Sequence, residues 1–398
     1  MMNEVFHSVP NSTQITIIGG GPAGSAAAIL LARQGYDVVL LEKDRFPRHK
    51  LCGEFLSLEA QGLLTELAAL ESIRARGSAG IHQARFTAAS GREIHFALPG
   101  ECLGISRYRF DEILFRRAQE EGVLALEGIE VCGCESLPES GWHRLRIRSM
   151  RDRSAQQWIE TKYCIGAFGR RSRMDWILQR DFLQDHHPYV GFKKHLRCRD
   201  DERGRECAAG MADTVEIHTF AGGYCGMCFV EEELVNCCML LEKRVLTGRS
   251  LTHWENLSLF LSEQNPVLCE RLNNLLPDES PLLSVAQVPF VRKEQARDGV
   301  LFIGDAAGMI SPLCGDGQAM ALQSAFLLAD LFAQNPALEQ STLARLWGQR
   351  WTREFGRRLR LGKVIQTVLF RPGLSHLFAR VTEFVPQLPV WLAKQTRG

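Results

Sequence analysis

A glycine-rich turn between two apolar runs constrains the fold of this chain more than any other feature. The turn, Gly19-Gly20-Gly21-Pro22-Ala23-Gly24, follows a β-rich apolar run at residues 15–18 and precedes a helix-forming run at residues 25–34. A second apolar run at residues 38–41 ends in the acidic residue Glu42. Strand, glycine turn, helix and acidic strand end, in this order, predict a βαβ unit that binds a dinucleotide.

Each part of this unit has a physical task. Gly19 permits the tight turn, Gly21 lets the backbone approach a pyrophosphate, and Gly24 lets the helix pack closely on the strand. Free N–H groups at the helix start favour the charge of the pyrophosphate, and Glu42 accepts hydrogen bonds from the adenosine ribose. The predicted nucleotide-binding residues are Gly19, Gly21, Pro22, Ala23, Gly24, Glu42 and Lys43.

Composition limits the other possibilities. The 398 residues, 45% hydrophobic and 23% charged, indicate a globular protein of two or three domains. A net charge of +1 gives no electrostatic case for a nucleic-acid partner. The uncharged residues 11–32 are glycine-rich, and no Lys or Arg precedes Arg33, so we expect no signal peptide and a cytoplasmic location. Thirteen cysteines, an odd number, indicate reduced thiols.

A second glycine-rich constellation lies much later in the chain. An apolar run at residues 300–303 leads into Gly304-Asp305-Ala306-Ala307-Gly308, and a helix is predicted from residue 318 to about residue 331. Asp305, at the end of the predicted strand, can bind a polyol hydroxyl, and the helix start presents N–H groups to a phosphate or an electron-rich ring. A reduced flavin carries negative charge at its N1–C2=O edge, which such a helix start stabilises. The predicted flavin-binding residues are Gly304, Asp305, Pro312, Gly315 and Gly317.

With these two constellations, the chain resembles the superfamily of FAD enzymes with the para-hydroxybenzoate hydroxylase fold, over most of residues 13–335. The superfamily includes aromatic hydroxylases, geranylgeranyl reductases and flavin-dependent halogenases. The resemblance implies that Glu42 and the first glycine turn bind the ADP part of FAD and that Asp305 binds the ribityl chain. The segment Ile105-Ser106-Arg107 is similar to the arginine-bearing segment of the family, which places Arg107 near the pyrophosphate. The alternative is that Arg107 only begins a solvated helix.

The segment Phe46-Pro47-Arg48-His49-Lys50-Leu51-Cys52-Gly53-Glu54 bears on the branch of the superfamily. It is similar to the proline–cysteine–glycine segment of the geranylgeranyl reductases and to the GES stretch of the halogenases, which both run beside the isoalloxazine ring. Cys52 is therefore a candidate catalytic residue, because a thiol or thiolate near the ring can tune it or donate protons. The alternative is a buried structural cysteine.

Two absences argue against the halogenase branch. Those enzymes place a lysine between flavin and substrate on a segment after the GES stretch, and this chain has no lysine between Lys50 and Lys162. Their WxWxIP motif is also missing, with residues 222–230 at the corresponding place.

The electron donor is left open by a third motif. Aromatic hydroxylases of this fold carry a DG motif that serves both FAD and NAD(P)H, but the matching segment here, residues 166–172, has Phe168 at the acidic position. NAD(P)H stays a possible donor, as does a separate reductase. Arg170, Arg171 and Arg173 either hold a phosphate or form a solvated turn.

No metal site is predicted. Cys225-x-x-Cys228 and Cys237-Cys238 have a spacing that can suit zinc, but they lie on two predicted strands, residues 224–230 and 234–241, joined by an acidic turn. Thiols on such strands are usually packing residues. The histidines have no acid or thiol at ligand spacing, so we assign them no role.

The predicted fold is α/β, with a Rossmann-like FAD-binding domain, an inserted β-sheet substrate domain and a C-terminal helical segment. The FAD-binding domain is expected at 1–76, 101–180 and 288–345, the substrate domain at 77–100 and 181–287, and the helical segment at 346–398. Residues 349–398 contain ten Lys/Arg and two acidic residues, interleaved with apolar residues. They either pack on the FAD domain with solvated basic faces or contact a membrane surface.

The function expected from this reading is an FAD-dependent monooxygenase. It would act on a hydrophobic small molecule or acyl-type metabolite, with a flavin C4a-hydroperoxide as oxygen donor. The alternative is a C=C reductase of the geranylgeranyl reductase type, which Cys52 and Gly53 slightly favour. A halogenase and a non-catalytic flavin-binding protein rank below both.

Overall fold

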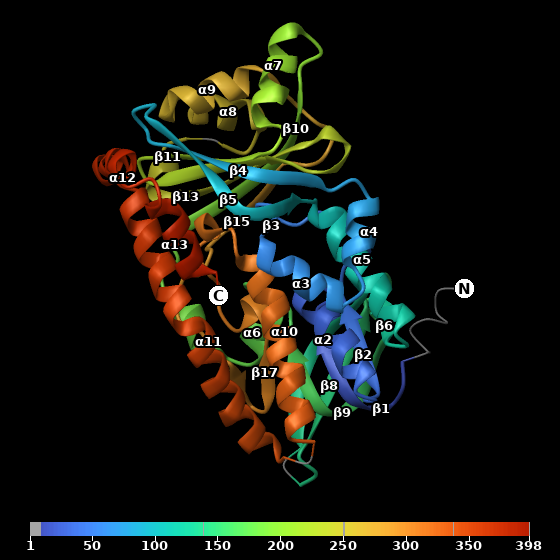
Figure 1. Ribbon diagram of the computed structural model, residues 1–398. Coiled ribbons are helices and arrows are strands. Elements are labelled where there is room, and N and C mark those ends of the chain that lie inside the picture. Colours follow the sequence, from blue (N-terminus) through green and yellow to red (C-terminus); the bar gives the residue numbers. More distant parts are fainter. Residues whose placement is uncertain (1–8, 138, 250, 337, 398) are drawn as a thin grey trace.

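Two β-sheets form the centre of the protein, and the chain passes from the first to the second and back twice (Figure 1). The computed structural model describes residues 9–137, 139–249, 251–336 and 338–397. The predicted FAD-binding domain includes residues 1–8, and the predicted helical segment includes residue 398. These residues lie outside the described part of the chain.

The first sheet has the strand order β16-β17-β9-β1-β2-β6, and the strands from β17 to β6 run parallel. An antiparallel pair, β7 and β8, extends it from β9. The strands are β1 (Ser12–Ile18), β2 (Val38–Glu42), β6 (Leu124–Glu127), β7 (Ile129–Leu137), β8 (Trp142–Ser149), β9 (Gln156–Gly166), β16 (Ala296–Arg297) and β17 (Val300–Phe302). The helices that accompany it are α2 (Pro22–Arg33), α3 (Leu58–Glu66), α4 (Leu70–Ala75), α5 (Arg107–Glu120), α6 (Arg173–Ile177) and α10 (Gly317–Gln334).

The predicted βαβ unit is confirmed within this sheet. β1 pairs in parallel with β2, with Ile15 opposite Val38 and Ile18 opposite Leu41, and α2 connects them. The helix begins at Pro22, a position that proline suits because the first N–H groups of a helix have no partner within it. The inner side of α2 is a run of small and branched apolar residues that is buried against the sheet.

The second sheet has the order β14-β10-β13-β12-β11-β4-β5-β3, with β15 also paired to β10. The strands are β3 (Phe55–Leu56), β4 (Ala79–Thr87), β5 (Glu93–Gly104), β10 (Tyr189–Cys198), β11 (Thr214–Phe220), β12 (Gly223–Phe229), β13 (Val235–Glu242), β14 (Leu275–Pro277) and β15 (Leu283–Ala286). Helices α7 (Glu202–Met211), α8 (Trp254–Gln264) and α9 (Pro266–Asn273) lie over its outer side (Figure 1). This sheet extends beyond the predicted substrate domain, residues 77–100 and 181–287. β5 continues past residue 100, and β3 comes from residues that were assigned to the FAD-binding domain.

Three helices follow the first sheet, as predicted for a C-terminal helical segment: α11 (Gln340–Leu369), α12 (Pro372–Phe384) and α13 (Leu388–Thr396). α11 runs along one side of both sheets (Figure 1). Its inner face places Trp347, Trp351 and Phe355 in the core of the first sheet, and the Trp347 indole donates to the Phe302 carbonyl at 2.9 Å. α12 and α13 lie at the far end, beside β5 and β11. Among the described residues, no helix has the length and apolarity needed to span a membrane.

Candidate active site

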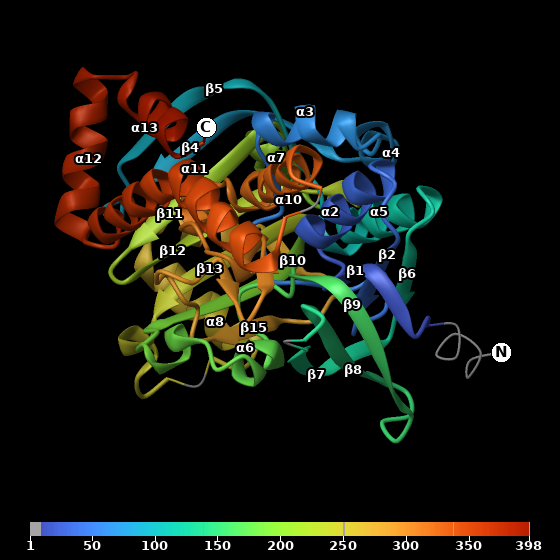
Figure 2. The same cartoon turned by 90° about the horizontal axis from the view of Figure 1, so that it is seen from below.

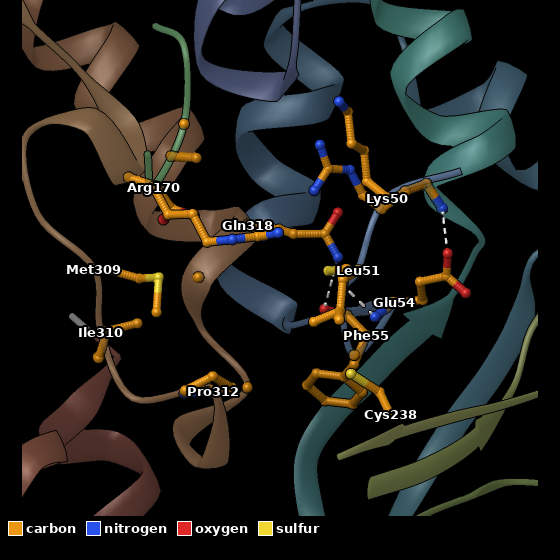
Figure 3. A pocket seen from close by; sticks show the side chains of 18 of the residues that line it. Lys50, Leu51, Glu54, Phe55, Arg170, Cys238, Met309, Ile310, Pro312 and Gln318 are labelled. Atoms are coloured by element: carbon orange, nitrogen blue, oxygen red, sulfur yellow. Dashed lines mark hydrogen bonds between the residues drawn. The ribbon is translucent and has the colours of Figure 1, made fainter. Parts of the chain in front are cut away.

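A cavity of about 500 Å³ lies between the two sheets and is lined by both. Its first end is formed by the two glycine-rich turns of the first sheet, and its second end by apolar side chains of the second sheet and of α11 to α13. Figure 3 shows Met309, Ile310 and Pro312 on one wall and Leu51 and Phe55 across from them. Both predicted constellations therefore line one cavity.

The two glycine turns touch each other although they are far apart in sequence. A Cβ built on Gly304, which has φ of +58°, would lie 2.9 Å from the Cβ of Ala23. A Cβ on Gly24 would lie 1.9 Å from the Gly19 carbonyl oxygen, which explains why only glycine fits there. The start of α2 and the end of β17 thus form one continuous surface.

Helix α2 presents a free N-terminus to this surface. Its N-cap, Gly21, makes no side-chain hydrogen bond to the first N–H groups, and those groups have no partner within the helix. A Cβ on Gly21 would have only Arg107 Nη2 within 4 Å, at 3.7 Å, so the guanidinium stands beside an open stretch of backbone. Helix N–H groups and an arginine are the groups that bind phosphate.

Glu42 is held rigidly at the end of β2. It is buried, with Oε2 accepting from the Gly20 N–H at 2.9 Å and Oε1 from the Asp44 N–H at 2.9 Å. Arg48 Nη2 lies 3.2 Å from Oε2. Glu42 and Lys43 both line the cavity, and a carboxylate fixed in this way still has lone pairs for a ribose.

Asp305 follows β17 directly and faces the cavity. Its side chain makes no hydrogen bond to any described residue, and burial raises the pKa of this carboxyl. Below it, the Lys293 ammonium donates to the carbonyls of Asp305 at 2.8 Å and Arg170 at 2.6 Å, and burial lowers the pKa of Lys293 to about 7. A carboxyl with free lone pairs at a cavity wall suits a polyol chain.

Helix α10 presents a second free N-terminus to the same cavity. Its N-cap, Asp316, makes no side-chain hydrogen bond to the helix, and Pro312, Gly315 and Gly317 line the cavity. Two helix N-termini at one cavity suit a ligand with phosphates at one part and an electron-rich ring at another. The residues present therefore fit FAD.

Comparison with known proteins agrees with this fit. Residues 12–185 match the family model described as an FAD binding domain. The fold matches that of the myxobacterial chondrochloren halogenase, described as a variant of FAD-dependent halogenases, with a TM-score of 0.77 and 18% identity over 96% of this chain and 91% of that chain. The chain contains an FAD-binding domain, and its relatives indicate an FAD-dependent enzyme.

Two further comparisons are with proteins that are named for different activities. The enzyme is 25% identical over 344 residues to a tryptophan 2-halogenase from Chondromyces crocatus, which covers 81% of this chain and 61% of that protein. The present chain therefore spans less than two thirds of the length of that halogenase. A geranylgeranyl bacteriochlorophyll reductase-like protein from Thermoplasma acidophilum has the same fold, with a TM-score of 0.72 and 19% identity over 90% of this chain and 88% of that chain.

Arg107 is the first residue of α5. Its side chain lies beside the first glycine turn, at Gly21, and not on a solvated surface. Its Nη2 is 2.7 Å from Asp111 Oδ2, and Asp111 also binds Arg48 Nη1 at 2.5 Å. Burial alone would raise the pKa of Asp111, but the two guanidinium groups hold it below its usual range. The predicted contact of Arg107 with the pyrophosphate stays a prediction, and the geometry is compatible with it.

Cys52 lines the cavity as a neutral thiol. Burial raises the pKa of this thiol, against the lowering effect of Arg107. Its sulfur lies 3.4 Å from the Glu54 backbone N–H. Burial therefore favours the neutral thiol over the thiolate that the sequence also allowed, and the catalytic role of Cys52 stays a prediction.

Sequence reasoning missed a buried charge cluster centred on Glu54. Its Oε1 accepts from the Arg107 N–H at 2.7 Å and from the Lys193 ammonium, and its Oε2 lies 2.6 Å from His195 Nε2. Burial alone would raise the pKa of Glu54, but Lys193 and His195 hold it below its usual range. The cluster ties the Cys52 loop of the first domain to β10 of the second sheet. Lys193 and His195, which alternate along one side of β10, were the available signal.

The cysteine pairs considered for zinc pack within the second sheet. Cys225 and Cys237 sit on neighbouring strands with their sulfurs 3.5 Å apart. In the described ranges, no group of three or more His, Cys, Asp or Glu side chains has the arrangement of a metal site. All thirteen cysteines are free thiols, as predicted.

Proposed function

We propose that this enzyme is an FAD-dependent monooxygenase that hydroxylates a hydrophobic, acyl-type small molecule. The observation that supports it most is the apolar half of the cavity. Aromatic and aliphatic side chains of both the second sheet and the C-terminal helices line this half, including Phe86, Phe96, Leu98, Ile217, Leu369 and Phe378. Such a lining favours an apolar substrate and excludes water from the reacting atoms.

Bound FAD would supply the electrons for activating oxygen. The overall step takes one C–H bond, one O2, two electrons and two protons, and gives one C–OH bond and one water. The residues of the chain bind and orient the reactants: α10 and Asp305 hold the flavin portion, the apolar walls hold the substrate, and the neutral Cys52 thiol is placed to give a proton from Sγ. The electrons come from NAD(P)H or from a separate reductase, as the missing DG acid leaves both open.

Arg397 supports an acyl-type substrate with a free carboxylate. The side chain lines the cavity and is 5% exposed, and its Nε and Nη1 have no hydrogen-bond partner among the described residues. The nearby Asp316 does not neutralise it fully, because burial raises the pKa of Asp316 to about 7, against the effects of Arg358 and Arg397. A buried guanidinium with two nitrogens that lack a hydrogen-bond partner favours binding of an anion.

Halogenation is the second candidate, because a tryptophan 2-halogenase is a relative at 25% identity. The lysines lining the cavity in the described part of the chain are Lys43 and Lys50. Lys43 follows Glu42 directly, and the Lys50 ammonium is bound at 2.6 Å by Asp44 Oδ2. Among the described lysines that line the cavity, none belongs to the second sheet or to the C-terminal helices that line the apolar half, where the halogenases' lysine would be needed.

The reaction type is decided by product analysis. The enzyme is reduced under nitrogen with NADH or NADPH, then mixed with isotopically labelled O2 and bromide in the presence of dodecanoate, an unsaturated fatty acid or a hydrophobic phenol. We expect a product that contains one labelled oxygen atom and no bromine. A brominated product would establish the halogenase candidate instead, and a saturated product formed without oxygen uptake would establish the reductase.

Replacing Arg397 with glutamine should weaken the binding of carboxylates selectively. We expect the dissociation constant of dodecanoate to rise about 10- to 100-fold, because the variant loses a hydrogen-bonded charge pair with the carboxylate. The dissociation constant of 1-dodecanol should stay the same. Equilibrium dialysis with the FAD-loaded enzyme measures both. Lys394→Gln, on the exposed side of α13, is the control and should change neither. An equal loss for acid and alcohol would mean that Arg397 only supports the cavity wall.

A further inference from the structure

The outer surface of the last three helices is unusually apolar. Twelve large hydrophobic side chains are exposed in the described chain, and seven of them lie on these helices or directly after α12: Val364, Leu374, Leu377, Val381, Phe384, Val385 and Trp391. Phe384 is 80% exposed and Trp391 is 55% exposed. Single exposed apolar residues are ordinary, but a concentration of them in one segment marks an interaction surface.

Helix α12 has an apolar stripe on its exposed side. Leu374, Leu377, Val381 and Phe384 are spaced three or four residues apart, so they form one stripe on the exposed side. The opposite side buries Ser375, Ala379 and Thr382, and Phe378 beside them lines the cavity. A helix at the surface normally turns a polar face to water. The apolar stripe on α12 therefore indicates a surface that another molecule covers.

Most charged residues of the last three helices are basic, and several of these bases form no ion pair with a described residue. Five exposed bases, which form no ion pair with any described residue, lie on or next to the three helices: Arg360, Lys363, Arg371, Arg380 and Lys394. The acids of the segment are already neutralised, since Glu354 binds Arg358 at 2.7 Å and Glu383 binds Arg92 at 2.8 Å. The surface therefore combines apolar side chains with a net positive rim.

The same helices form both this surface and the wall of the cavity. Pro389, Leu392 and Ala393 of α13 line the cavity, while Trp391 on the same helix is exposed. In Figures 1 and 2, α12 and α13 lie at the outer edge of the molecule, away from the N-terminal strands. A partner on this surface would lie within one helix thickness of the substrate.

We propose that the outer face of α12 and α13 docks on the surface of an anionic lipid bilayer. Leu377, Phe384 and Trp391 enter the boundary between headgroups and acyl chains, and the five bases contact anionic headgroups. An amphipathic helix with basic flanks has the pattern of a helix that lies in the membrane interface. A hydrophobic substrate would then enter the cavity from the lipid side, past α12 and α13. The docking itself does not depend on the reaction proposed above.

Flotation with lipid vesicles tests the proposal on the FAD-loaded full chain. We expect binding to phosphatidylcholine vesicles that contain about a third phosphatidylserine, weak binding to pure phosphatidylcholine, and a loss of binding at high salt. The double variant Leu377→Ser/Phe384→Ser should lower the vesicle partition coefficient on the order of tenfold or more. Arg371→Gln/Arg380→Gln should reduce binding to the anionic vesicles only.

The matched control is Leu259→Ser, which replaces a 63% exposed leucine on α8, over the opposite side of the second sheet. It should bind vesicles like the unchanged protein, and all variants should keep their FAD content and circular dichroism. Equal vesicle binding by the unchanged protein and the Leu377/Phe384 variant would overturn the proposal. So would a dimer in size-exclusion chromatography that the double variant converts to monomers, because a second copy would then cover this face.

Discussion

Gly24→Ala should yield protein without FAD and with a much lower free energy of unfolding. The added Cβ would lie 1.9 Å from the Gly19 carbonyl oxygen and 3.0 Å from the Ala167 Cβ. The first contact is with backbone of the same turn, so relief requires α2 to move away from β1 and to open the phosphate site. We expect a destabilisation of about 3 kcal/mol, the upper end of the costs of overpacking. Urea unfolding and the flavin absorbance of the purified protein measure both effects.

Gly62→Ala is the matched control for this substitution. Gly62 also lies within a helix, α3, but a Cβ there would have no neighbour within 4 Å. Alanine is favoured over glycine inside a helix, so this variant should be more stable by roughly 0.5–1 kcal/mol and should keep FAD. If Gly24→Ala also bound FAD fully, the close packing of α2 on β1 would not be required for the cofactor.

Asp305→Ala should fold normally but lose FAD on purification. The side chain faces the cavity without a hydrogen-bond partner among the described residues, so its loss removes the bond to the ribityl chain and, besides that, the attraction of the carboxyl to Lys293, Arg170 and Arg107. A hydrogen bond to a charged group contributes about 1.5–3 kcal/mol, so the dissociation constant of FAD should rise about 10- to 100-fold. Quenching of flavin fluorescence measures this constant.

The stability of the Asp305 variant separates a binding effect from misfolding. Burial raises the pKa of this carboxyl, so any stability that it contributes is present below its unfolded pKa and is lost as the pH rises through its folded pKa. At pH 8 its removal should therefore leave the free energy of unfolding unchanged or higher. Asp330→Ala, at an exposed site on α10, should retain FAD. An unchanged FAD affinity in Asp305→Ala would move the flavin end of the site elsewhere.

The first half of the cofactor site could be predicted from sequence because its parts are local. Glycines, the helix start and Glu42 lie within one βαβ unit, where turn geometry and strand pairing fix their relation. The strand and helix around Asp305 were predictable for the same reason. The resemblance implied that this strand and helix contact the βαβ unit. The close approach of Gly304 to Ala23 shows the contact in the structure.

The Glu54 cluster and Arg397 could not be predicted in this way. Glu54 meets Lys193 and His195 only because β10 of the second sheet passes behind the Cys52 loop, which depends on how two sheets pack. Arg397 was counted among the bases of a solvated or membrane-facing segment, but it is buried in the cavity wall. Periodicity and spacing describe neighbours within one element, and they contain no information about which element lies opposite.

The thiols around the cavity have a consequence for oxidative damage. Reduced flavin that meets oxygen without completing a turnover releases hydrogen peroxide, which attacks thiolates far faster than thiols. Cys52, Cys228, Cys238 and Cys314 all line the cavity, and burial raises the pKa of each of these thiols, to about 12 for Cys314. Burial in the walls of this cavity thus favours the neutral form of four sulfur atoms, the form that hydrogen peroxide attacks slowly.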